Sequence, residues 1–233
     1  MTDSTLDLSA VRMQLSKMAD RILMRLHDRS GFPLNRPVYE RGAVKMVSGQ
    51  QSSFLELGAG GDRGLSRVVG PLPLPGPVSV GELDAAGCGG SARRRCARDP
   101  GCDHRASGPA LAVYIDVVLP QLCVPGEDAQ TYGETVYIDA DTLELLNERI
   151  QVGRKVAMAK IASDLALWDL IERPEERMER LRDRAREEAV LEDVEQRARR
   201  YEIDPALARS VFVWVIEQTI RVEVAFLQGM RGL

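Results

Sequence analysis

Apolar side chains recur every three or four positions along the first part of the chain. The stripe that they form between residues 6 and 29 consists of Leu8, Val11, Leu15, Met18, Ile22 and Leu26. Spacings of three and four bring residues onto one face of an α-helix, so the stripe predicts an amphipathic helix. The sequence that follows, SGFPLNRPVYE, contains a glycine and two prolines, which end the helix.

Helical patterns return further along the chain. The apolar stretch 109–123 predicts one helix, and the polar stretch 124–137 predicts a linker. Asp139 or Asp141 is in a position to cap the next helix, which we expect to run to about Leu170.

The last two helical patterns differ in polarity. Residues 173–202 are highly charged, with a thin apolar seam, and predict a helix that is mostly solvated. Residues 203–228 are apolar nearly all round and predict a core helix, with Asp204 as its cap and Pro205 at its first position. No segment has a convincing β pattern. The expected fold class is therefore all-α, a helical bundle formed by a single domain over residues 1–233.

The stretch 58–110 has a different character. It is rich in Gly, Pro, Ala and Arg and has neither a helical nor a strand period. Such a composition supplies little apolar surface for a core, so we expect this segment to be mostly irregular.

Composition and charge exclude several classes of function. The 233 residues are 44% hydrophobic, which is enough for a substantial core, and their net charge is −4. This near balance argues against a nucleic-acid-binding surface. No run of about 18 apolar residues predicts a membrane span, and the start lacks a signal-peptide pattern. A cytoplasmic protein is expected.

The cysteines do not indicate a metal site. Cys88, Cys96 and Cys102 fall near His104, and Cys123 lies apart from them. None forms a CxxC pair, and the spacing matches no zinc pattern. We expect free thiols and neither a metal nor a cofactor.

Two cations stand out on a helix face that is otherwise apolar. Arg149 and Lys160 are eleven residues apart, which at about 100° per residue returns to nearly the same face, roughly 16 Å along the axis. Val152, Gly153 and Val156 lie between them on that face. A buried unpaired charge is costly, so each cation needs an anion. Acidic side chains could supply these anions, or a ligand with two carboxylates, for which the fork of arginine is suited.

Further polar residues lie on faces expected to be buried or to border the core. Thr219 and Glu223 are four residues apart on the last helix, Asp183 and Glu187 are four apart on the charged helix, and Arg12 borders the first apolar stripe. The candidate site consists of Arg12, Arg149, Lys160, Asp183, Glu187, Thr219 and Glu223. Internal ion pairing is the alternative, above all for the two acidic residues of the charged helix.

Four stretches share the pattern of one known family. They are VRMQLSKMADRILMRLHDRSGFPLNRPVYE, LELLNERIQVGRKVAMAKIASD, EEAVLEDVEQRARRYEIDP and VIEQTIRVEVAFL. Together they resemble the all-helical chorismate mutases, and among these the fungal and plant type. The resemblance extends over roughly residues 7–57 and 111–229.

The resemblance implies roles for the candidate residues. Arg12, Arg149 and Lys160 would hold the two carboxylates of chorismate, and Lys160 and Glu223 would face the ether oxygen of the breaking bond from opposite sides. The catalytic residues would thus be Lys160, Glu223 and Arg149.

The remaining residues would shape the pocket. Glu187 would bind the ring hydroxyl and Thr219 would line the wall, whereas Asp183 falls where the family has Asn. The reaction implied is the rearrangement of chorismate to prephenate in the shikimate pathway, towards phenylalanine and tyrosine. It proceeds within one molecule, by conformational restraint and electrostatic stabilisation, without metal or cofactor.

The family pattern also implies a homodimer, with chorismate as the small-molecule partner and without nucleic acid or membrane. Two alternatives stay open: a related lyase acting on isochorismate, and a non-catalytic helical dimer that acts as a partner or regulator.

Residues 58–110 depart from the family, which has an SPD-containing stretch there. Read one nucleotide later, with free wobble bases, PLPLPGPVSV can encode Arg-Tyr-Arg-Ser-Pro-Asp, close to that stretch. We hypothesise that part of the segment is translated out of frame, which sequencing the gene across it would test. Glu134 follows Gly133 where the family has Ser, so control by tryptophan or tyrosine is not expected.

Overall fold

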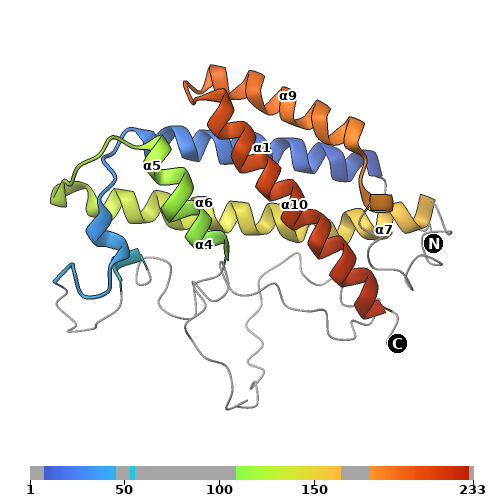
Figure 1. Ribbon diagram of the computed structural model, residues 1–233, viewed down its shortest axis with the longest axis horizontal. Coiled ribbons are helices and arrows are strands. Elements are labelled where there is room, and N and C mark those ends of the chain that lie inside the picture. Colours follow the sequence, from blue (N-terminus) through green and yellow to red (C-terminus); the bar gives the residue numbers. More distant parts are fainter. Residues whose placement is uncertain (1–7, 46–52, 56–108, 164–178, 231–233) are drawn as a thin grey trace, which may run out of the picture.

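The computed structural model describes residues 8–45, 53–55, 109–163 and 179–230, and it consists of long helices packed side by side (Figure 1). The long elements are α1 (Leu8–Ser30), α6 (Tyr132–Gln151), α7 (Gly153–Ser163), α9 (Arg184–Arg200) and α10 (Pro205–Met230). Within the described ranges the regular structure is entirely helical, which confirms the predicted all-α class. The segment expected to be irregular lies outside the described residues, except that its last two residues begin a helix.

Shorter elements connect the long ones. They are η1 (Arg36–Tyr39), η5 (Ala129–Thr131) and three consecutive helical pieces, α4 (Pro109–Val113), η4 (Tyr114–Val118) and α5 (Leu119–Leu122). The middle piece is a π-helix, so the predicted apolar helix 109–123 is present but irregular in its winding.

The first helix follows its apolar stripe. α1 buries Val11, Met18, Ala19, Ile22, Leu23 and Leu26. This face packs against α6, which runs alongside α1 (Figure 1). The periodicity of the sequence therefore located both the helix and its buried side.

The predicted cap of the next helix is wrong. α6 begins at Tyr132, and Asp139 lies within it with no exposed surface. Its carboxylate accepts hydrogen bonds from Arg29 Nε at 2.9 Å and from the hydroxyls of Tyr39 at 2.6 Å and Tyr114 at 2.7 Å. Asp139 is thus the buried anion of a network that joins α6 to α1, η1 and η4.

Asp141 is not a cap either, because it pairs with Arg25 of α1. The stretch 124–137 was predicted as a linker, but it is α-helical from Tyr132 onwards. Side chains in its helical part are hydrogen-bonded across the bundle. Thr135, which is fully buried, accepts from the side-chain amide of Asn35 at 2.9 Å.

The charged helix is interrupted where continuity was predicted. Residues 182–183 are not helical, and Asp183 is the N-cap of α9, accepting a hydrogen bond from the backbone N–H of Arg186 at 3.0 Å. Asp183 and Glu187 therefore do not share a helix face as expected. The predicted helix ends at 164–170 and 173–178 lie outside the described residues.

The last helix has the predicted start and the predicted central place. Pro205 is its first residue, and the carboxylate of Asp204 accepts from the backbone N–H of Ala206 at 3.0 Å. α10 crosses α6 and α7 and packs against α9 (Figure 1). In the part of the chain that is described, no helix is long and apolar enough to cross a membrane.

Two small apolar clusters lie beside the main core. One joins α1 to the α6–α7 junction and contains Val11, Met18, Val152 and Val156. The other joins α7 to α10 and contains Ala157, Ile161, Leu181, Phe226 and Leu227. Helices from three parts of the sequence are thereby fixed around one cavity.

Candidate active site

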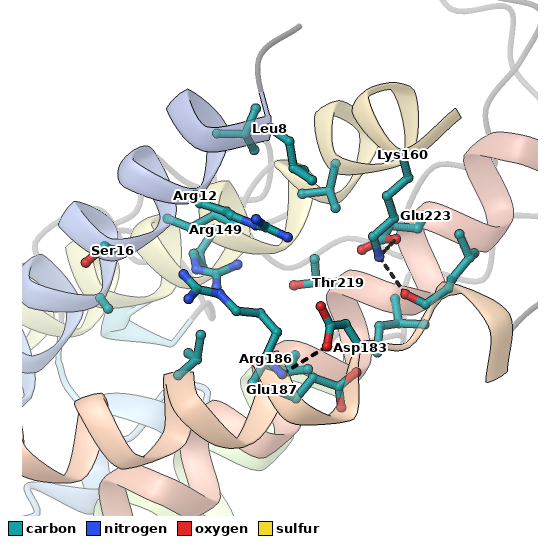
Figure 2. A pocket seen from close by; sticks show the side chains of 18 of the residues that line it. Leu8, Arg12, Ser16, Arg149, Lys160, Asp183, Arg186, Glu187, Thr219 and Glu223 are labelled. Carbon is teal, nitrogen blue, oxygen red and sulfur yellow. Dashed lines mark hydrogen bonds and ion pairs between the residues drawn. The ribbon is translucent and has the colours of Figure 1, made fainter. Parts of the chain in front are cut away.

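All seven polar residues singled out in the sequence line one cavity of about 170 Å³. They come from five segments: Arg12 from α1, Arg149 from α6, Lys160 from α7, Asp183 and Glu187 from the start of α9, and Thr219 and Glu223 from α10. Leu8, Val11, Leu15, Val156, Val190, Val194, Ile216 and Ile220 supply apolar wall. Figure 2 shows the charged groups gathered around this space.

Arg149 is a buried cation in which two nitrogen atoms have no hydrogen-bond partner among the described residues. Its side chain lies at the cavity with only 5% of the residue exposed, and its Nε and Nη1 atoms make no hydrogen bond. Burial lowers the pKa of Arg149 to about 10, and the nearby Glu223 opposes this effect. Leaving a buried donor unsatisfied costs about 1–3 kcal/mol, and more when the group is charged. An anion placed in the cavity would remove that cost.

Two further arginines converge on the same end of the cavity. Figure 2 shows Arg12 and Arg186 directed towards the space beside Arg149. Among the described residues neither guanidinium has an ion-pair partner. Three guanidinium groups close together repel one another, so this end is suited to a ligand that carries more than one negative charge.

Arg186 is the cavity-lining cation that sequence reasoning missed. It stands in the run RLRDRAREE, where its neighbours Arg182 and Arg184 pair with Glu187 and Glu179. Nothing in the pattern separates it from them. Only the recognition of Asp183 as an N-cap, which places Arg186 in the first turn of α9, would have pointed to it.

Lys160 and Glu223 form an ion pair at the other end of the cavity, away from the arginines. Lys160 Nζ lies 2.7 Å from Glu223 Oε2 and also donates to the carbonyl of Leu181 at 2.6 Å. An ammonium group has three N–H donors, so one is left for a ligand.

The carboxyl of Glu223 is poised between its two protonation states. It is 2% exposed, and burial raises its pKa to about 7. Lys160 opposes this rise, Glu187 adds to it, and Arg149 opposes it. At neutral pH a large fraction of the molecules therefore carries a protonated Glu223, which can donate a hydrogen bond.

The three remaining residues differ in the hydrogen-bonding atoms that they have left for a ligand. Glu187 lies 3.8 Å from Arg182, a loose pair that leaves carboxylate oxygens facing the cavity. The Asp183 carboxylate lines the cavity and is engaged as the cap of α9. The hydroxyl of Thr219 donates to the Val215 carbonyl at 2.7 Å, so it can only accept from a ligand.

The expectation of free thiols concerns mostly residues that are not described. Cys88, Cys96, Cys102 and His104 lie outside the described residues, whereas Cys123 is free and buried. Within the described ranges, no group of three or more His, Cys, Asp or Glu residues is placed to hold a metal ion.

Comparison with known proteins gives one consistent family. The family model described as chorismate mutase type II matches residues 131–224. A chorismate mutase of Emericella nidulans is 28% identical over 220 residues, which cover 86% of this chain and 78% of that protein. The cytosolic chorismate mutase 2 of Zea mays is 25% identical over 249 residues and covers 95% of both chains.

A solved structure shares the fold. The chorismate mutase of Candida albicans, in complex with L-Trp, matches with a TM-score of 0.73 at 20% identity, covering 98% of this chain and 93% of that one. The resemblance that the sequence predicted is confirmed. Residues 131–224 match the type II chorismate mutase family, and the chain is similar over most of its length to chorismate mutases of fungi and plants.

Proposed function

We propose that this protein is a chorismate mutase, an isomerase that converts chorismate to prephenate. The observation that carries the proposal is Arg149, a buried cation whose Nε and Nη1 atoms have no partner, placed across the cavity from the Lys160–Glu223 pair. Relatives named chorismate mutase over most of the chain support it.

Substrate binding is assigned to the arginine end of the cavity. Chorismate is a dianion, and its two carboxylates would be held by Arg12, Arg149 and Lys160, with Arg186 as an additional partner. Arginine suits a carboxylate because its planar fork donates two parallel hydrogen bonds. With both carboxylates held, the flexible enolpyruvyl arm is kept folded over the ring, which is the shape that reacts.

Bond rearrangement is assisted at the other end. As the C–O bond breaks, negative charge grows on the ether oxygen, and the third N–H of Lys160 and a protonated Glu223 are the donors placed to stabilise it. No nucleophile is needed, because every bond that forms or breaks lies within chorismate. Restraint and electrostatics together must supply at least about 8 kcal/mol to reach typical enzymatic acceleration.

The start of α9 is assigned to recognition of the ring. Glu187 would accept a hydrogen bond from the ring hydroxyl, and Thr219 would line the wall between the two ends. Asp183 would act by holding the first turn of α9, which carries both Arg186 and Glu187.

Assembly and location complete the proposal. We infer a homodimer in the cytoplasm, acting towards phenylalanine and tyrosine. Support comes from the family resemblance and from the maize relative, whose name gives it as cytosolic. Lack of control by tryptophan or tyrosine stays a prediction from Glu134.

The test is the loss of chorismate absorbance on addition of purified protein, beside Arg149→Ala. We expect prephenate from the wild type and at least about a 100-fold lower kcat/KM from the variant. Isochorismate offered in a parallel reaction separates the lyase alternative. Turnover of neither compound, together with no binding of a transition-state analogue, would leave the non-catalytic dimer.

A further inference from the structure

Gly153 has a helical backbone conformation that any residue could adopt, so its backbone does not require glycine. It follows Val152, at which the regular winding between α6 and α7 is interrupted, and it is buried. Glycine is among the least favourable residues inside a helix, because it loses the most conformational freedom there. A reason for its presence has to come from what it touches.

What it touches is the backbone of α10. A Cβ atom on Gly153 would lie 2.6 Å from the carbonyl oxygen of Thr219, 3.2 Å from Thr219 Cγ2 and 3.3 Å from Val222 Cβ. A carbon atom does not approach an oxygen to 2.6 Å without strong repulsion. Neither the carbonyl nor a Cβ can rotate away as the end of a flexible side chain would. A side chain at 153 would therefore force α7 and α10 apart.

The same helix interface carries the ion pair of the site. Lys160 follows Gly153 by seven residues, which places it two turns further on the same face of α7. Glu223 follows Thr219 by four residues, one turn further on α10. Figure 1 shows α10 crossing the line of α6 and α7, and α10 packs against α7. The separation of the two helices at Gly153 thus bears directly on the distance from Lys160 to Glu223.

We propose that Gly153 is a positioning residue of the active site: its lack of a side chain sets the closeness of α7 and α10 at which Lys160 Nζ reaches Glu223 Oε2. The inference goes beyond the proposed function, and it rests on that function only where turnover is measured.

The charges around Glu223 fix the direction of the expected change. Lys160 faces it from α7, Arg149 from α6 and Glu187 from α9, and of these Lys160 opposes the effect of burial most strongly. If α7 moves outwards, the attraction between Lys160 and the Glu223 carboxylate weakens, whereas the effect of burial and the repulsion from Glu187 remain. The pKa of Glu223 then rises.

The experiment is Gly153→Ala with two readouts. The first is the titration of the Glu223 carboxyl by ¹³C NMR in selectively labelled protein without ligand, where we expect the midpoint to rise by about one pH unit. The second is the kinetics, where we expect kcat to fall about 10-fold or more. KM should change less, because Arg12 and Arg186 are held by α1 and α9.

A matched control lies on α6. Gly133 has nothing within 4 Å of an added Cβ, so Gly133→Ala should leave both the titration and kcat unchanged. A folded Gly153→Ala variant with wild-type titration and wild-type kcat would overturn the inference.

A second variant covers the case in which Gly153→Ala does not fold. Ala157 is fully buried in the apolar cluster that joins α7 to Phe226 and Leu227 of α10. Ala157→Val widens the same interface from another point and should give the same pair of changes. Its failure to change either one would count against the inference. Because the titration needs no chorismate, an inactive wild type would remove the proposed function and leave this inference standing or falling by itself.

Discussion

Lys160 Nζ lies 2.7 Å from Glu223 Oε2, although the two residues are 63 positions apart in the chain. Lys160 is part of an ion pair that is partly open to the cavity, whereas Glu223 is almost completely buried. The pair therefore joins a fixed positive charge to a carboxyl group that takes up a proton near neutral pH. Two of the predictions below follow from that arrangement.

The pH dependence of turnover should report Glu223. If the protonated carboxyl donates to the ether oxygen, kcat/KM is high in acid and falls as the pH rises through about 7. Glu223→Gln keeps a donor at every pH and should flatten the profile. Glu217→Gln is the control on the same helix, because Glu217 is paired with Arg221 outside the cavity. A wild-type profile that is flat across this range would remove the role given to Glu223.

Stability should depend on pH through the same residue. The folded state binds the Glu223 proton more tightly than the unfolded state, because the pKa is raised from 4.5 to about 7. The resulting stabilisation is complete below the unfolded value and is lost as the pH rises through about 7, an amount of about 3 kcal/mol. Urea unfolding of wild type and Glu223→Gln at about pH 4 and pH 8 measures it. An equal pH dependence in both proteins would contradict the prediction.

Arg149→Met should separate stability from activity. The substitution removes a buried charge with two unpartnered nitrogen atoms, so the free energy of unfolding of the free protein should rise by about 1–4 kcal/mol. The same change should lower kcat/KM by about 100-fold or more. Arg154→Met, on the next turn but outside the cavity lining, is the control. A variant that is less stable and still active would show that Arg149 is a structural residue.

Arg186→Gln tests the residue that the sequence did not reveal. A partner of a substrate carboxylate binds the ground state and the transition state alike, so KM should rise about 10-fold with little change in kcat. Arg184→Gln removes an arginine from the same turn that pairs with Glu179 on the surface. Equal kinetics in the two variants would exclude Arg186 from substrate binding.

Asp183 should act through its cap rather than through its charge. Asparagine caps a helix as well as aspartate does, so Asp183→Asn should keep both stability and KM. Asp183→Ala should lose about 1 kcal/mol of stability and raise KM, because the first turn of α9 frays. Thermal melting and steady-state kinetics distinguish the two variants. Equal damage from Asn and Ala would mean that the negative charge itself is used.

The parts of the fold that were predicted correctly are those determined by local patterns. The apolar stripe of α1 and the Asp204–Pro205 start of α10 lie within the sequence that they organise. The start of α6 could not be read in this way. Its polar first turns are stabilised by Asn35, about a hundred residues earlier, and no local pattern shows that contact.

The sequence predicted which residues come together at one cavity, but not how they are arranged there. Cations and carboxyls on apolar faces, together with the family resemblance, singled out seven residues, and all seven line the cavity. The interruption at 182–183 was missed because the charge pattern continues through it, and with it the orientation of Arg186. Which arginine of a charged run enters a cavity depends on where the helix begins, and a single capping hydrogen bond decides that.

The buried pair of Arg29 and Asp139 has a consequence for synthesis. Neither side chain has any exposed surface, and 110 residues separate them. When α1 leaves the ribosome, the Asp139 carboxylate that pairs with Arg29 has not yet been made. Burying the Arg29 guanidinium without this carboxylate is too costly. The native docking of that helix therefore waits until α6 has emerged, when more than half of the chain has already been made.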